Sequence, residues 1–143
     1  MTAAAVLGPR QAGIWRLAGE PSSVAIFRRI ARAAARSEAQ AEAAALCVSE
    51  LVTNAIVHTR SGLPGGTVAV WLTADESTGE LHILVEDSGA RVMPPAGPGQ
   101  CGPAEHGYGL RIVARVAASW GSSARADGPG SVTWCHIPAA VSR

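Results

Sequence analysis

The chain has 143 residues and a formal net charge of +1, a length that suits one domain with a real hydrophobic core. So small a charge creates no broad field for nucleic acid or an anionic membrane, and we expect neither as a direct partner. All twelve basic residues are arginines, which excludes a Walker A phosphate loop and a Schiff-base lysine, because both need the amine.

The first half of the chain predicts one strand and two helices. Residues 1–12 predict a loose tail that precedes a single domain over 13–143. Alternating apolar residues in 13–17 predict a strand. Pro21 suits the first turn of the helix that follows, where its missing N–H costs little. A second helix is expected from Glu38 to about Thr59, because apolar residues recur there with helical spacing.

The second half predicts an antiparallel hairpin, a long loop, a short helix and two closing strands. Residues 90–106 are rich in proline and glycine, and irregular stretches this long inside a compact domain are usually functional. The chain shows no internal repeat and no second domain. The expected strands cover 67–72, 81–86, 119–126 and 131–137.

The three cysteines form no CxxC pair and no zinc-ligand spacing. We therefore expect a reduced, cytoplasmic setting. Cys47 and Cys135 lie in apolar segments and are predicted to be core residues, whereas Cys101 lies in the Gly/Pro loop and is a candidate exposed thiol. We identify no signal peptide, and no apolar run is long enough to cross a bilayer.

Polar residues follow one margin of the second helix. Glu50, Asn54 and His58 lie four residues apart, beside the apolar stripe, so they step slowly round one side of the helix. This placement at the edge of a buried face indicates a functional role; an amphipathic helix whose polar border happens to carry these residues is the alternative interpretation.

Arg28, Arg32 and Arg36 also recur every four residues, on the preceding helix. A solvated face is the simpler interpretation of these arginines, and a docking surface for an acidic partner is the sharper one.

Two further segments carry residues that suit the binding of a ligand. Asp87 ends a strand and Gly89 follows it closely, while Gly107 and Gly109 open a helix. A carboxylate accepts hydrogen bonds from an exocyclic amine, glycines let the backbone approach a ligand, and helix N-termini favour phosphate. An amide oxygen such as that of Asn54 is a hard ligand of the kind that Mg²⁺ takes.

These segments resemble the GHKL ATPase/kinase superfamily over residues 15–138. The short single-domain layout is most similar to the small anti-sigma-factor serine/threonine kinases of bacteria. The N box of the superfamily is matched at residues 50–58 and its G1 box at 87–89. Its G2 box is matched at 107–110, and residues 130–134 stand in the place of its last glycine box. The resemblance implies an α+β class fold of Bergerat type, a two-layer α/β sandwich with a mixed, mostly antiparallel sheet and helices on one face.

The resemblance also implies ATP and Mg²⁺ as cofactors and a set of site residues. Glu50 would be the catalytic base. Asn54 would bind Mg²⁺ and be one of the nucleotide-binding residues. Asp87 would contact the adenine amine, and Gly89 would pass beside the base. The residues at the triphosphate would be Gly107, Tyr108, Gly109 and Leu110, under a lid formed by residues 90–106.

The implied activity is phosphorylation of a serine or threonine on an anti-anti-sigma (STAS-type) partner, with a sigma factor as the second partner and a homodimer as a possible state. The small size and one departure also permit a nucleotide-sensing interaction module with little or no catalysis. The last box usually has a threonine two residues before its aromatic, and this position is Val132, which lacks the hydroxyl that such a threonine would offer to the base. A detached catalytic domain of a histidine kinase and an α/β domain without nucleotide are the weaker alternatives.

Overall fold

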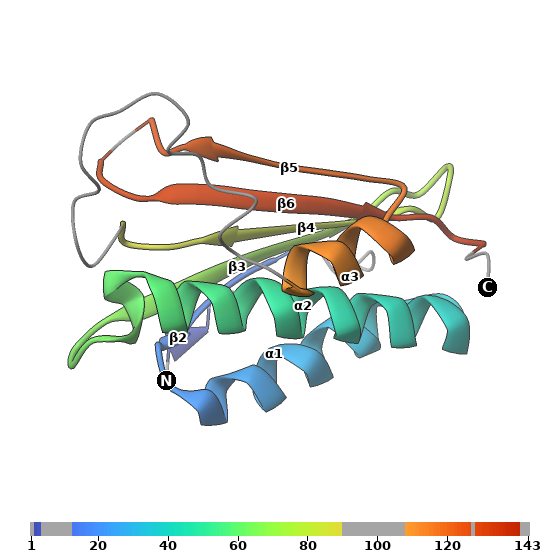
Figure 1. The fold of residues 1–143 in the computed structure, drawn as a ribbon. Helices are drawn as coiled ribbons and strands as arrows, with labels where there is room; N and C mark the ends of the chain where they lie inside the picture. Colours follow the sequence, from blue (N-terminus) through green and yellow to red (C-terminus); the bar gives the residue numbers. More distant parts are fainter. Residues whose placement is uncertain (1, 4–12, 90–107, 127, 141–143) are drawn as a thin grey trace.

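The computed structural model describes residues 2–3, 13–89, 108–126 and 128–140, which form a two-layer α+β sandwich (Figure 1). One layer is a six-stranded sheet in the order β1-β2-β3-β4-β6-β5. The other holds all three α-helices, on one face of the sheet. The strands are β1 (Thr2–Ala3), β2 (Gly13–Ala18), β3 (Thr67–Ala74), β4 (Leu81–Glu86), β5 (Ser119–Ala124) and β6 (Ser131–Ile137). The helices are α1 (Pro21–Ala34), α2 (Glu38–His58) and α3 (Tyr108–Val116), with the 3-10 turn η1 (Arg60–Gly62).

The expected α+β sandwich is confirmed, with one correction to its sheet. A mixed, mostly antiparallel sheet was expected, whereas every described strand pair is antiparallel. The strands β2 and β3, before and after the α1–α2 pair, run in opposite directions. The strands β4 and β5, before and after α3, run in the same direction, but β6 lies between them and is antiparallel to both, so no two neighbouring described strands are parallel. The tail expected for residues 1–12 lies mostly outside the described residues, but Thr2 and Ala3 pair with Arg16 and Trp15 of β2.

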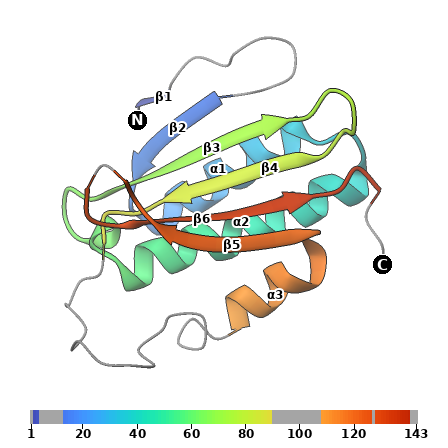
Figure 2. The same ribbon diagram turned by 90° about the horizontal axis from the view of Figure 1, so that it is seen from above.

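Helix α2 is the centre of the helical layer and lies between α1 and α3 (Figures 1 and 2). Its start is capped by Ser37, whose side chain accepts a hydrogen bond from the backbone N–H of Gln40. Ala44, Cys47 and Val48 are completely buried, because small side chains let the helix lie close to the sheet. The buried Gln40 amide donates to the carbonyls of Gly79 and Pro138, which fixes α2 to one end of the sheet.

The turn between β3 and β4 is organised by Asp75. Its Oδ1 accepts hydrogen bonds from the backbone N–H groups of Ser77 (2.8 Å) and Thr78 (3.0 Å) and from the Ser77 hydroxyl (2.8 Å). The Thr78 and Ser77 donors lower the pKa of Asp75 from 3.8 to about 2, since they favour the charged form. The carboxylate therefore stabilises this turn only while it is ionised.

We expect this contribution to disappear in acid. Because the folded pKa lies below the unfolded one, the stabilisation is complete above about pH 4 and is lost as the pH falls through about 2. The Asp75→Ala variant should unfold at a slightly lower temperature than the wild type at pH 6, and the difference should shrink at pH 3. Thermal unfolding followed by circular dichroism measures both, and an equal difference at the two pH values would contradict the role.

Candidate functional site

The second half of α2, the end of β4 and the start of β6 meet at one end of the molecule. The backbone N–H of Arg60, just after α2, donates to the carbonyl of Gly89 at 2.7 Å. The backbone N–H of Ser88 donates to the Ser61 hydroxyl at 3.0 Å. These bonds join the segment directly after the N box to the G1 box, although the two are far apart in the sequence.

Asp87 is a buried carboxylate, 8% exposed, at the end of β4. Its Oδ1 accepts from the backbone N–H groups of Gly89 (2.8 Å) and Ser131 (3.2 Å), and its Oδ2 accepts from the Ser131 hydroxyl (3.0 Å). The carboxylate thus accepts three hydrogen bonds from the protein. Within the described residues Oδ2 has only one of these hydrogen bonds, so it can accept another from a ligand amine.

Ser131 is a candidate site residue that the sequence interpretation missed. It shares a face of β6 with Cys135 and Ile137, both completely buried in the core under the helices. Val132 pairs with Glu86 and points to the uncovered face, whereas Thr133 pairs with Val85, which is 2% exposed in the core. The assumption that position 132 faces the base is therefore wrong, and the last glycine box offers its hydroxyls from 131 and 133. The alternation of Ser131 and Thr133 with Cys135 and Ile137 is the signal that could have found this.

Two glycines allow the G1 box and the last glycine box to lie in contact. Gly89 and Gly130 have φ angles of +101° and +115°, a conformation that residues with a Cβ rarely adopt. A Cβ on Gly130 would lie 2.1 Å from the carbonyl oxygen of Asp87. The close approach of these loops is what brings Ser131 to the Asp87 carboxylate.

Asn54, and less closely Glu50, lie on the side of α2 that faces β6. Cys47 precedes Asn54 by seven residues, so their side chains lie nearly in line on the helix. The Cys47 thiol hydrogen-bonds that of Cys135 on β6, which raises the pKa of Cys135 together with burial. Both thiols are buried, as predicted. Cys101 lies outside the described residues.

The side chains of Glu50 and Asn54 are half-buried. In the described part of the chain neither has a hydrogen bond or an ion pair with another side chain. A half-buried carboxylate and amide without protein partners are suited to a ligand, because an unpaired polar group is costly away from water. Their oxygens fit Mg²⁺, which binds few protein ligands and keeps water and phosphate for the rest.

The G2 box is described in part. Gly107 and the predicted lid lie outside the described residues. Tyr108, Gly109 and Leu110 form the first turn of α3, beside α2, and their side chains are not among those described. The backbone N–H groups of a helix's first turn have no intrahelical partner, which suits a phosphate there.

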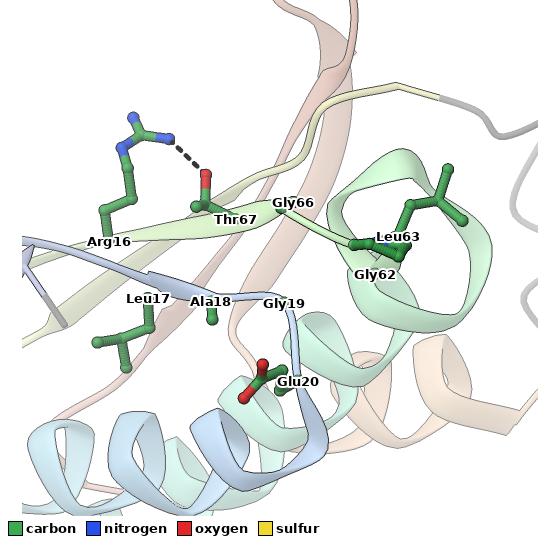
Figure 3. Close-up of a pocket in the computed structure, with 11 residues that line it drawn as sticks. Arg16, Leu17, Ala18, Gly19, Glu20, Gly62, Leu63, Gly66 and Thr67 are labelled. Atoms are coloured by element: carbon green, nitrogen blue, oxygen red, sulfur yellow. Dashed lines mark hydrogen bonds between the residues drawn. The ribbon is translucent and has the colours of Figure 1, made fainter.

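An open cavity of about 640 Å³ lies elsewhere, at the junction of β2 and β3 (Figure 3). It is lined by residues 16–20 and 62–67, and none of the predicted site residues is among them. Its one basic group, Arg16, already contacts Thr67 at 3.4 Å and Glu86 at 4.0 Å. Much of the remaining lining is glycine backbone, so the cavity offers no converging polar groups.

The fold, together with the residues where α2, β4 and β6 meet, defines an ATP-binding domain of the GHKL class. Residues 17–135 match the family model described as histidine kinase-like ATPase domain, and the chain belongs to this family. Domains of this family bind ATP, usually with Mg²⁺. No curated protein matches the chain. Within the residues that the structure describes, no helix combines the length and apolar character needed to cross a membrane.

Proposed function

We propose that this protein is an ATP-binding anti-sigma regulatory factor with serine/threonine kinase activity towards an anti-anti-sigma, STAS-type partner. The observation that carries the proposal is the pair of Glu50 and Asn54, half-buried and without side-chain partners among the described residues. The chain's length and its resemblance to the small kinases support the regulatory role. The proposed setting is the cytoplasm, without direct contact to nucleic acid or membrane.

The site residues divide the proposed work between them. Asp87 Oδ2 accepts a hydrogen bond from the adenine amine, which guanine lacks at that position, so ATP is favoured over GTP. Asn54 holds Mg²⁺, which neutralises phosphate charge when bound. Glu50 accepts the proton of the partner's serine or threonine hydroxyl. As it does so, the hydroxyl oxygen bonds to the γ-phosphorus of ATP and ADP leaves.

The partners follow from the same proposal. The phosphorylated STAS-type protein would be released, and the factor would then bind its sigma factor, as a monomer or a homodimer. The sequence argument for a catalytically weak sensor module relied on Val132 and on the small size of the chain. Since Val132 points away from the helical layer, the first of these grounds is weakened, and Ser131 supplies a hydroxyl beside Asp87.

Replacing Asn54 by alanine tests the nucleotide site. We expect the wild type to bind ATP more tightly with Mg²⁺ than without it, and Asn54→Ala to lose about tenfold or more of its Mg²⁺-dependent affinity, because one strong polar contact is worth over 1 kcal/mol. Isothermal titration calorimetry measures both. Thr53→Ala is the matched control, since Thr53 is the exposed neighbour on the same helix turn. An Asn54→Ala variant with unchanged Mg²⁺ dependence would refute the metal assignment.

A further inference from the structure

Two histidines and a glutamate converge on the sheet face opposite the described helices. Glu80 directly precedes β4, His82 lies on β4, and His136 lies on β6 directly opposite His82. The two imidazole rings are stacked, with centroids 4.1 Å apart and an interplanar angle of 22°. The antiparallel register of β4 and β6 creates this cluster from residues distant in the sequence.

One carboxylate oxygen faces both imidazoles. Glu80 Oε1 lies 2.7 Å from His82 Nε2 and 3.7 Å from His136 Nδ1. The three candidate ligand atoms all lie within 4.8 Å of one another. Ligand atoms of a tetrahedral ion with bonds of about 2.0–2.2 Å are roughly 3.4 Å apart. Small side-chain rotations would therefore bring these atoms to the distances that an ion needs.

We propose that Glu80, His82 and His136 form a binding site for a divalent transition metal ion, with Zn²⁺ as the best match. Two imidazoles and a carboxylate are a ligand set typical of zinc, and three protein ligands leave a fourth position for water. Hard cations such as Mg²⁺ and Ca²⁺ prefer oxygen ligands only, so they do not fit this cluster.

The surroundings of the cluster also favour a metal ion. Burial chiefly, and the neighbouring His82, lower the pKa of His136, although Glu80 opposes this. A metal ion would bind the neutral form of the imidazole. The three side chains are 30–33% exposed, so an ion can enter from solvent.

This site is separate from the nucleotide site. His82 precedes Asp87 by five residues, which separates them by about 17 Å along an extended strand. The cluster lies on the uncovered face, whereas Ser131 faces the helical layer. A metal bound here would link β4 to β6 and could stabilise the fold without any change at Glu50 or Asn54.

Zinc binding by the full chain, purified without a histidine tag and treated with chelator, tests the proposal. Calorimetric titration with ZnCl₂ should give one site per chain, and zinc should raise the Tm of the wild type by mass action. His82→Ala and His136→Ala should each lower zinc affinity by at least about tenfold, because even supporting residues of metal sites contribute that much. His58→Ala, at the end of α2 and away from the cluster, should bind zinc as the wild type does.

Glu80→Gln is a second variant that keeps the shape of the side chain, so it guards against a histidine variant that fails to fold. It should also weaken zinc binding, with an unchanged circular dichroism spectrum. The proposal is overturned if the wild type binds no zinc, since the cluster is then only a solvated His–Glu pair. It is equally overturned if the three cluster variants keep the wild-type affinity, because cysteine thiols would then be the ligands.

Discussion

Replacing Glu50 by glutamine should lower phosphoryl transfer to a STAS-type partner by about 10²–10⁴-fold, the usual contribution of a general base. Glutamine has the same shape but cannot take the hydroxyl proton. ATP affinity should stay within about twofold, because the lost interaction belongs to the transition state rather than to nucleotide binding. Single-turnover transfer of labelled γ-phosphate measures the rate, and calorimetry measures the affinity.

Glu42→Gln is the matched control for this experiment. Glu42 lies on the same helix, is exposed, and precedes Glu50 by about two turns, so it should change neither rate nor affinity. Retained transfer by Glu50→Gln would refute its role as the base. If the wild type binds ATP but transfers phosphate to no partner, the kinase proposal fails, and a nucleotide-binding interaction module becomes the better description.

The sequence predicted most of the secondary structure because its signals are local. The cap of α2 at Ser37, the proline at the start of α1 and the glycines after β4 all act within a few residues. The grouping of Glu50, Asn54 and Asp87 at one end of the molecule depended on the resemblance, which gives the order of the boxes. The structure adds the bonds that join the segment after α2 to the segment after β4, such as that from Arg60 to Gly89.

What the sequence did not reveal depends on strand register and on which face a residue occupies. A shift of one residue moves a side chain to the other face of a sheet, and for this reason the sequence alone does not reveal that Val132 lies on the face away from the helices. The cluster of Glu80, His82 and His136 was missed for a similar reason. It exists only because β4 and β6 pair with His82 opposite His136, and spacing in the sequence contains no sign of that pairing.

Replacing Asp87 by asparagine should reduce ATP affinity by about 10–100-fold, because a hydrogen bond to a charged group contributes roughly 1.5–3 kcal/mol. The variant should still fold. The amide oxygen can accept from the N–H groups of Gly89 and Ser131 as Oδ1 does, and the Ser131 hydroxyl can rotate to accept from the new NH₂. Thermal unfolding should therefore give a Tm close to that of the wild type.

The same substitution should also change the preferred base, which separates recognition from simple loss of structure. An asparagine NH₂ in place of Oδ2 presents a donor to the adenine amine, which is itself a donor, whereas the base of inosine triphosphate has a carbonyl at that position. Asp87→Asn should thus bind inosine triphosphate better relative to ATP than the wild type does. Ser131→Ala removes the hydroxyl but leaves the carboxylate, so it should weaken ATP binding by only about 2–10-fold and keep the preference for adenine. An equal loss for both nucleotides in Asp87→Asn would mean that Asp87 holds the loops together and does not read the base.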